Sequence, residues 1–86
     1  MYEDVKKLME IIVNDRTVPR NIRAAVKKAR DSLDEKGDDS VKISTAIHIL
    51  DEIINDPNMP MYTRTQIWNI VGKLEEIRTK LTKTKK

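Results

Sequence analysis

Apolar side chains recur along this chain every three to four residues, the spacing that lines one face of an α-helix. Four segments carry this pattern, at about residues 3–14, 19–36, 40–54 and 60–81. The alternation of apolar and polar residues that a half-buried β-strand needs is not sustained anywhere in the sequence. The pattern therefore predicts an all-α fold. The residues expected to form its core are Val5, Leu8, Met9, Ile12, Val13, Ile22, Ala25, Val26, Ala29, Leu33, Ile43, Ala46, Ile47, Leu50, Ile53, Ile54, Ile67, Ile70, Val71, Leu74 and Ile77.

Residues that end or begin helices separate these four segments. Asn14 and the Asp after it are expected to end the first helix, and Pro19 to lie in the first turn of the second, where a missing backbone N–H costs nothing. Gly37 is expected to cap the end of the second helix, and Asp39 or Ser40 to cap the start of the third. Because short connections make consecutive helices antiparallel neighbours, we predict an antiparallel up-and-down four-helix bundle.

The two halves of the chain share a sequence pattern. The pattern N-D-x-x-[V/M]-P-x-x-x-R begins at Asn14 and again, 41 residues later, at Asn55, each time between two apolar helices. In each copy the Asp is expected to pair with the Arg that lies one turn inside the following helix. We predict that the bundle is made of two repeated helical hairpins, at about residues 3–36 and 40–81.

Composition limits the size and the chemistry of this protein. With 86 residues the chain can build one core, so we expect a single domain over residues 1–81 and a flexible Lys-rich tail at 82–86. The absence of Cys excludes disulfides, thiolate catalysis and sulfur-ligated zinc, and two Gly are too few for a Gly-rich phosphate loop. No signal peptide or membrane-spanning run is recognisable, so we predict a cytoplasmic protein.

His48 is the only histidine, and Asp51 and Glu52 follow it within about one helical turn. These side chains could hold a divalent ion, but the closed ligand set of known metal sites is missing, which favours a solvated His beside carboxylates. No Ser and no pair of carboxylates stands in a recognisable catalytic arrangement. We therefore predict that the protein is not an enzyme, with no catalytic residues, metal ion, cofactor or small-molecule substrate.

Basic residues gather on one flank of the second predicted helix. Six basic residues and no acidic residue lie between positions 16 and 30. Such a flank could follow a phosphate backbone or an acidic protein surface. The net charge is only +3, and few aromatic residues are available to stack on bases, so a solvated basic face is favoured. The basic-face candidates are Arg16, Arg20, Arg23, Lys27 and Arg30.

Trp68 lies off the apolar stripe of the fourth predicted helix, as Ile49 does on the third. Two interpretations of Trp68 stay open, because periodicity alone does not settle burial. The side chain could belong to a wide flank of the core, or it could anchor an interface with another protein. The interaction candidates are Tyr62, Arg64, Trp68 and Ile49.

Three segments carry specific motifs. They are D-R-T-V-P-R-N-I-R (15–23), I-H-I-L-D-E-I-I-N-D-P-N-M-P (47–60) and T-R-T-Q-I-W-N-I-V (63–71). The sequence resembles, over nearly all of its length apart from the tail, a small archaeal all-helical family of unknown function. The resemblance implies a four-helix bundle of bromodomain-like topology and no activity, because none is assigned to that family. A shared topology does not confer function, and no acetyl-lysine pocket is recognisable.

We therefore expect a non-catalytic helical bundle that acts as a protein–protein interaction or self-association module, either with an unknown protein partner or as a homodimer. The alternative is an accessory protein that associates with RNA or the ribosome through the basic face of the second helix. Neither hypothesis involves a membrane.

Overall fold

The computed structural model describes residues 1–84, and the side chains of residues 1–82. Over these residues the chain is helical, with no β-strand. The helices are α1 (Glu3–Val13), α2 (Arg20–Ser32), α3 (Asp39–Ile53) and α4 (Met61–Thr84). The predicted all-α fold class is confirmed.

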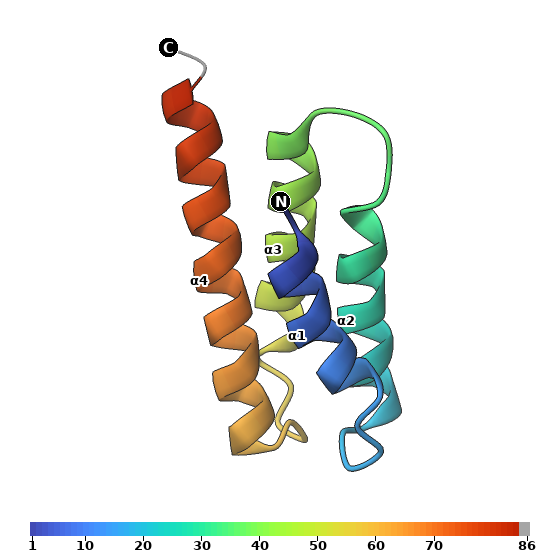
Figure 1. Cartoon of the computed structure of the whole chain (residues 1–86). Coiled ribbons are helices and arrows are strands. Elements are labelled where there is room, and N and C mark those ends of the chain that lie inside the picture. The colour runs from blue at the N-terminus through green and yellow to red at the C-terminus, as the bar shows by residue number, and fades with distance from the viewer. Residues whose placement is uncertain (85–86) are drawn as a thin grey trace.

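The four helices surround one core. Helix α1 packs against α2 and α4, and α3 packs against α2 and α4. Each helix runs opposite to the one before it, so that the α1–α2 and α3–α4 loops lie at the same end of the molecule (Figure 1). Helix α4 is the longest, and its last turns extend beyond the other helices (Figure 1). None of the helices is long and apolar enough, over the described residues, to cross a lipid bilayer.

The core contains most of the predicted residues and two that periodicity does not predict. Leu8, Val13 and several others of the predicted set are only half-buried and pack around its edge. Val18 and Met59 are buried although they lie in loops, each directly before a Pro. The buried hydrophobic residues are Val5, Met9, Ile12, Val18, Ile22, Val26, Ala29, Leu33, Ile43, Ala46, Ile47, Leu50, Met59, Ile67, Ile70 and Leu74.

The α1–α2 and α3–α4 loops have the same hydrogen-bond pattern. In each loop the carboxylate of an Asp, Asp15 or Asp56, accepts a hydrogen bond from the backbone N–H two residues later, at 2.9 and 2.8 Å. The carbonyl of the same Asp accepts another from the N–H of Val18 or Met59, at 3.1 Å in both loops. This turn holds the chain so that the residue before each Pro points into the core.

The boundaries of the α2–α3 connection differ from the prediction. Helix α2 ends at Ser32, well before Gly37, which lies in the loop with a φ of +133°. No apolar residue between Leu33 and α3 is available to bury another turn of helix, so the chain leaves α2 early. The N-cap of α3 is Asp38, whose carboxylate accepts a hydrogen bond from the N–H of Ser40 at 2.8 Å.

Two further helix boundaries differ from the prediction. Pro19 is the N-cap of α2 instead of part of its first turn. Helix α4 continues through Thr84, although the prediction ended it near Leu81 and placed residues 82–86 in a tail. Of the predicted tail, residues 85–86 lie outside the described residues.

Candidate interaction surface

The outer face of the first half of α4 carries large exposed apolar side chains. Trp68 is 59% exposed, and Met61 and Tyr62 are each 72% exposed. Of the two interpretations of Trp68, the structure excludes a flank of the core. A Trp on the surface of a small domain is unusual, because indole is the largest apolar group that folding can bury.

This face is also free of charge. Every exposed position of α4 from Met61 to Gly72 is an uncharged residue, in a chain of which 36% of residues are charged. No Asp or Glu occurs between positions 57 and 74. Depletion of charge together with Trp, Tyr and Met is the composition of the centre of a protein interface. The uncharged α4 face, as we name it, consists of Met61, Tyr62, Thr65, Trp68, Asn69 and Gly72.

Gly72 is a member of this face that the sequence analysis missed. It lies four residues after Trp68 and therefore on the same side of the helix. Apart from its two neighbours in the chain and the backbone of its own helical turns, a Cβ added to Gly72 would meet no heavy atom within 4 Å. Glycine within an exposed helix costs about 1 kcal/mol relative to alanine, and no neighbour in this chain requires it. The result is a shallow notch in the surface of α4, lined by Gly72, Glu75, Glu76, Thr79 and Lys80. An isolated Gly inside a long helical pattern was the signal that could have revealed it.

The four interaction candidates do not form one surface. Arg64 is half-buried, and its Nε and Nη2 donate hydrogen bonds to the carbonyls of Ile54 and Asp56, both at 3.2 Å. Its partners are thus main-chain carbonyls at the end of α3 and in the loop that follows. The predicted pairing with an Asp side chain is wrong for Arg64. Tyr62 and Trp68 both belong to the uncharged α4 face, where they lie at its two edges, about 120° apart around the helix. Of the four interaction candidates, only Tyr62 and Trp68 are strongly exposed.

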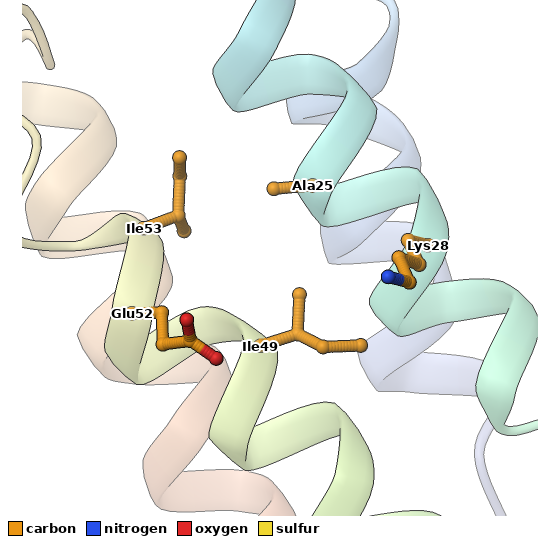
Figure 2. A pocket seen from close by; sticks show the side chains of 5 residues that line it. All are labelled: Ala25, Lys28, Ile49, Glu52 and Ile53. Carbon is orange, nitrogen blue, oxygen red and sulfur yellow. The ribbon is translucent and has the colours of Figure 1, made fainter.

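Ile49 lies elsewhere, in a shallow groove between α2 and α3 (Figure 2). The apolar side chains of Ala25, Ile49 and Ile53 line the groove, and the ends of Lys28 and Glu52 lie on its two sides (Figure 2). Ile49 and Ile53 pack against the core, so the groove is the edge of the core between these helices. The opposite flank of α3 faces α4, which keeps Ile49 apart from Trp68.

The basic face of α2 is partly neutralised. Nη1 of Arg30 lies 3.0 Å from the Glu10 carboxylate on α1, and Nη2 lies 3.2 Å from that of Asp31. Arg23 is half-buried, and its Nε is buried with no hydrogen-bond partner among the described residues. The exposed members of the basic face are Arg16, Arg20 and Lys27.

The titratable side chains form ion pairs on the surface. Nε2 of His48 lies 2.8 Å from the Glu52 carboxylate, with both side chains exposed. Within residues 1–82, no group of three or more His, Cys, Asp or Glu side chains is placed to hold a metal ion.

A polar cluster ties the start of α1 to the start of α3. The Tyr2 hydroxyl donates a hydrogen bond to Asp39 Oδ1 at 2.7 Å, and Lys42 Nζ lies 3.2 Å from the same oxygen. Burial raises the pKa of Tyr2, and the hydrogen bond to Asp39 raises it further. The same hydrogen bond, followed by that of Lys42, lowers the pKa of Asp39. These groups satisfy one another, which gives them a structural role.

The fold and this surface define a small four-helix protein with an uncharged helix face. The chain belongs to the uncharacterised protein family UPF0147, whose model matches residues 1–77. It is 56% identical over 79 residues to a UPF0147 protein of Methanocaldococcus jannaschii, covering 91% of this chain and 85% of that protein. It is 51% identical over 75 residues to one of Thermococcus kodakarensis, covering 86% of this chain and 90% of that protein. The resemblance to an archaeal family of unknown function is confirmed.

Two crystal structures are similar to this one. The unknown-function protein MMP1188 aligns with a TM-score of 0.83 at 50% identity, covering 85% of this chain and 84% of that chain. A UPF0147 protein from Thermoplasma acidophilum aligns with a TM-score of 0.83 at 32% identity, covering 87% and 89% of the two chains. These relatives share the fold and carry no described activity.

Proposed function

We propose that this protein is a non-catalytic self-association module that binds a second copy of itself through the uncharged α4 face. The observation that carries the proposal is the exposure of Trp68 within a helix face whose exposed positions are all uncharged. Burying such a face removes apolar area from water, at about 25 cal/mol per Å². The face itself contains no charged side chain that would lose its hydration. The cost of desolvation therefore offsets little of the free energy gained by burying apolar area.

The net charge of the chain favours this face over the others for pairing two copies. Like copies carry the same net charge of +3 and repel one another wherever basic surfaces meet. The outer side of α2 exposes Arg20 and Lys27, and would oppose such contact. The uncharged α4 face avoids that repulsion. The RNA-associated alternative receives less support, because Arg30 is paired with Glu10 and Asp31.

Sedimentation equilibrium of the wild type and of Trp68→Glu tests the proposal. We expect the wild type to dimerise with a micromolar Kd and Trp68→Glu to be a monomer, because the variant places a charge in the centre of the interface. Val41→Glu is the matched control, since Val41 is a comparably exposed apolar residue on α3. It should dimerise like the wild type. A wild type that stays monomeric at millimolar concentration, or a Trp68→Glu variant that still dimerises, overturns the proposal.

We also infer that the up-and-down bundle consists of two repeats of one helical hairpin, α1–α2 and α3–α4. The matching hydrogen bonds of Asp15 and Asp56 support this, as does the burial of Val18 and Met59 at equivalent positions. The pattern recurs after 41 residues in both sequence and hydrogen bonding.

A further inference from the structure

We infer that the two copies pair through antiparallel α4 helices about a two-fold axis near Ile70, with each Trp68 seated in the Gly72 notch of the other copy. This inference rests on the proposed function, because it specifies how the uncharged α4 face meets a second copy of itself.

The argument begins with the symmetry of a two-fold interface. In such an interface, residue i of one copy contacts residue j of the other, and j contacts i. A surface can therefore pair with itself only if it carries both a protruding group and a recess to receive it. On α4 the protruding group is the Trp68 indole, and the recess is the shallow notch that begins at Gly72 and continues between the charged side chains of Glu75, Glu76 and Lys80.

The spacing of these two residues determines the direction of the second helix. Trp68 and Gly72 lie on one side of α4, one turn and about 6 Å apart along the helix axis. Turning a second α4 end over end about a point level with Ile70 brings its Gly72 opposite the first Trp68, and its Trp68 opposite the first Gly72. Both rings are then buried by the same motion. The absence of a side chain at Gly72 then has a reason, because the indole of the other copy occupies that space.

The charges at the edge of the face favour the same arrangement. Arg64 and Glu75 lie on one flank of α4, about 20° apart in helical projection, six residues before and five residues after Ile70. The end-over-end turn keeps each flank on its own side, so that Arg64 of one copy lies beside Glu75 of the other. Two parallel helices about a two-fold axis would instead place this flank on opposite sides of the interface, so that Arg64 of one copy and Glu75 of the other would not meet.

Because the chain has no Cys, engineered cysteines can test this register without side reactions. Thr65→Cys and Glu75→Cys change exposed residues that lie five positions before and after Ile70, so the antiparallel register places them at the same level across the interface. Mixing the two variants under mild oxidation should give mainly the 65–75 disulfide. Each variant alone should cross-link poorly, because its two copies lie about 15 Å apart and a disulfide needs Cα atoms within about 7 Å.

A second variant tests the notch itself. Gly72→Leu should weaken dimerisation by about tenfold or more, because the new side chain fills the recess that receives Trp68. It should leave the circular dichroism spectrum and the melting temperature of the monomer unchanged or raised, since a Cβ at position 72 meets nothing beyond its own helical turns. Gly72→Leu that dimerises like the wild type overturns the inference.

The two proposals fail in different ways. A monomeric wild type removes the proposed function and the register together. A wild type that dimerises through Trp68, but in which Thr65→Cys or Glu75→Cys alone cross-links better than the mixture, overturns the antiparallel register and leaves the self-association intact.

Discussion

The α1–α2 and α3–α4 loops have the same backbone hydrogen bonds, yet their side chains join the bundle differently. Each loop inserts one apolar residue into the core, Val18 in the first and Met59 in the second. Met59 is larger than Val18, and its unbranched side chain adapts to irregular space in the core.

The arginines that follow the two loops differ more, because their hydrogen bonds are not the same. Arg64 donates two hydrogen bonds to main-chain carbonyls of the loop and of the end of α3. Arg23, at the equivalent position, has a buried Nε with no partner among the described residues. The shared sequence pattern therefore determines the backbone of the loop, whereas the partner of the arginine depends on the helices around it.

The largest changes in stability are expected for substitutions of Val18 and Met59, the apolar residues that the two loops insert into the core. Met59→Ala should lower the free energy of unfolding by about 2–4 kcal/mol, through lost burial and the cavity left behind. Val18→Ala should lower it by about 1–2 kcal/mol, because fewer buried carbon atoms are removed. Urea unfolding followed by circular dichroism measures both values.

Met61→Ala is the control for Met59→Ala, since Met61 is exposed in the monomer two residues further along the chain, and the titration uses protein dilute enough to be monomeric. It should change stability by no more than about 0.5 kcal/mol. Equal losses for Met59→Ala and Val18→Ala would mean that the two loops anchor the fold equally.

A smaller effect is expected at the arginines. Arg64→Ala should cost about 1–2 kcal/mol, because it removes two hydrogen bonds from a charged donor to carbonyls at the end of α3 and in the loop after it. Arg23→Ala should cost less than half as much, and Arg20→Ala, at an exposed position, should be neutral. The same urea titration compares the three variants. If Arg23→Ala proves as costly as Arg64→Ala, Arg23 has a stabilising contact of its own and the contrast between the loops is lost.

The sequence predicted the helices well because their signal is local. Apolar spacing at three and four residues requires only that one face be buried, and residues such as Met9, Ile43 and Leu74 are buried as expected. Burial of Val18 and Met59 could not be predicted in this way. Their positions lie outside any helical period, and a tertiary insertion decides their burial.

The candidate surface was predicted only in part. Trp68 was singled out by its position off the apolar stripe, but its exposure depended on how far α3 covers α4, which no local pattern contains. The pairing of Arg30 with Glu10 depends on the packing of α1 against α2. Ile49 and Trp68 were grouped because both lie off the apolar stripes of their helices, and the fold places Ile49 beside α2 and Trp68 on the outer face of α4.

The smallest predicted effect is on the loss of stability at low pH. The Asp15 carboxylate accepts hydrogen bonds from the hydroxyl of Thr17 at 2.6 Å and from its backbone N–H at 2.9 Å, and these bonds lower the pKa of Asp15 below its usual 3.8. The second loop has Asn58 at the equivalent position, which donates to Asp56 through its backbone N–H. The hydroxyl is therefore a feature of the first loop.

A carboxyl group with a lower pKa in the folded chain stabilises the fold above the unfolded value, and that contribution is lost as the pH falls through the folded pKa. Wild-type stability should therefore decline as the pH falls below about 5 and through 3.8. Thr17→Ala should make this decline shallower, because the pKa of Asp15 moves back toward 3.8. Glu3, Asp34 and Asp39, whose pKa values are also lowered, preserve a residual acid dependence in both proteins. Thermal melts at a series of pH values compare the two slopes. Parallel slopes would show that the hydroxyl does not set the pKa of Asp15, and the two loops would then respond alike to acid.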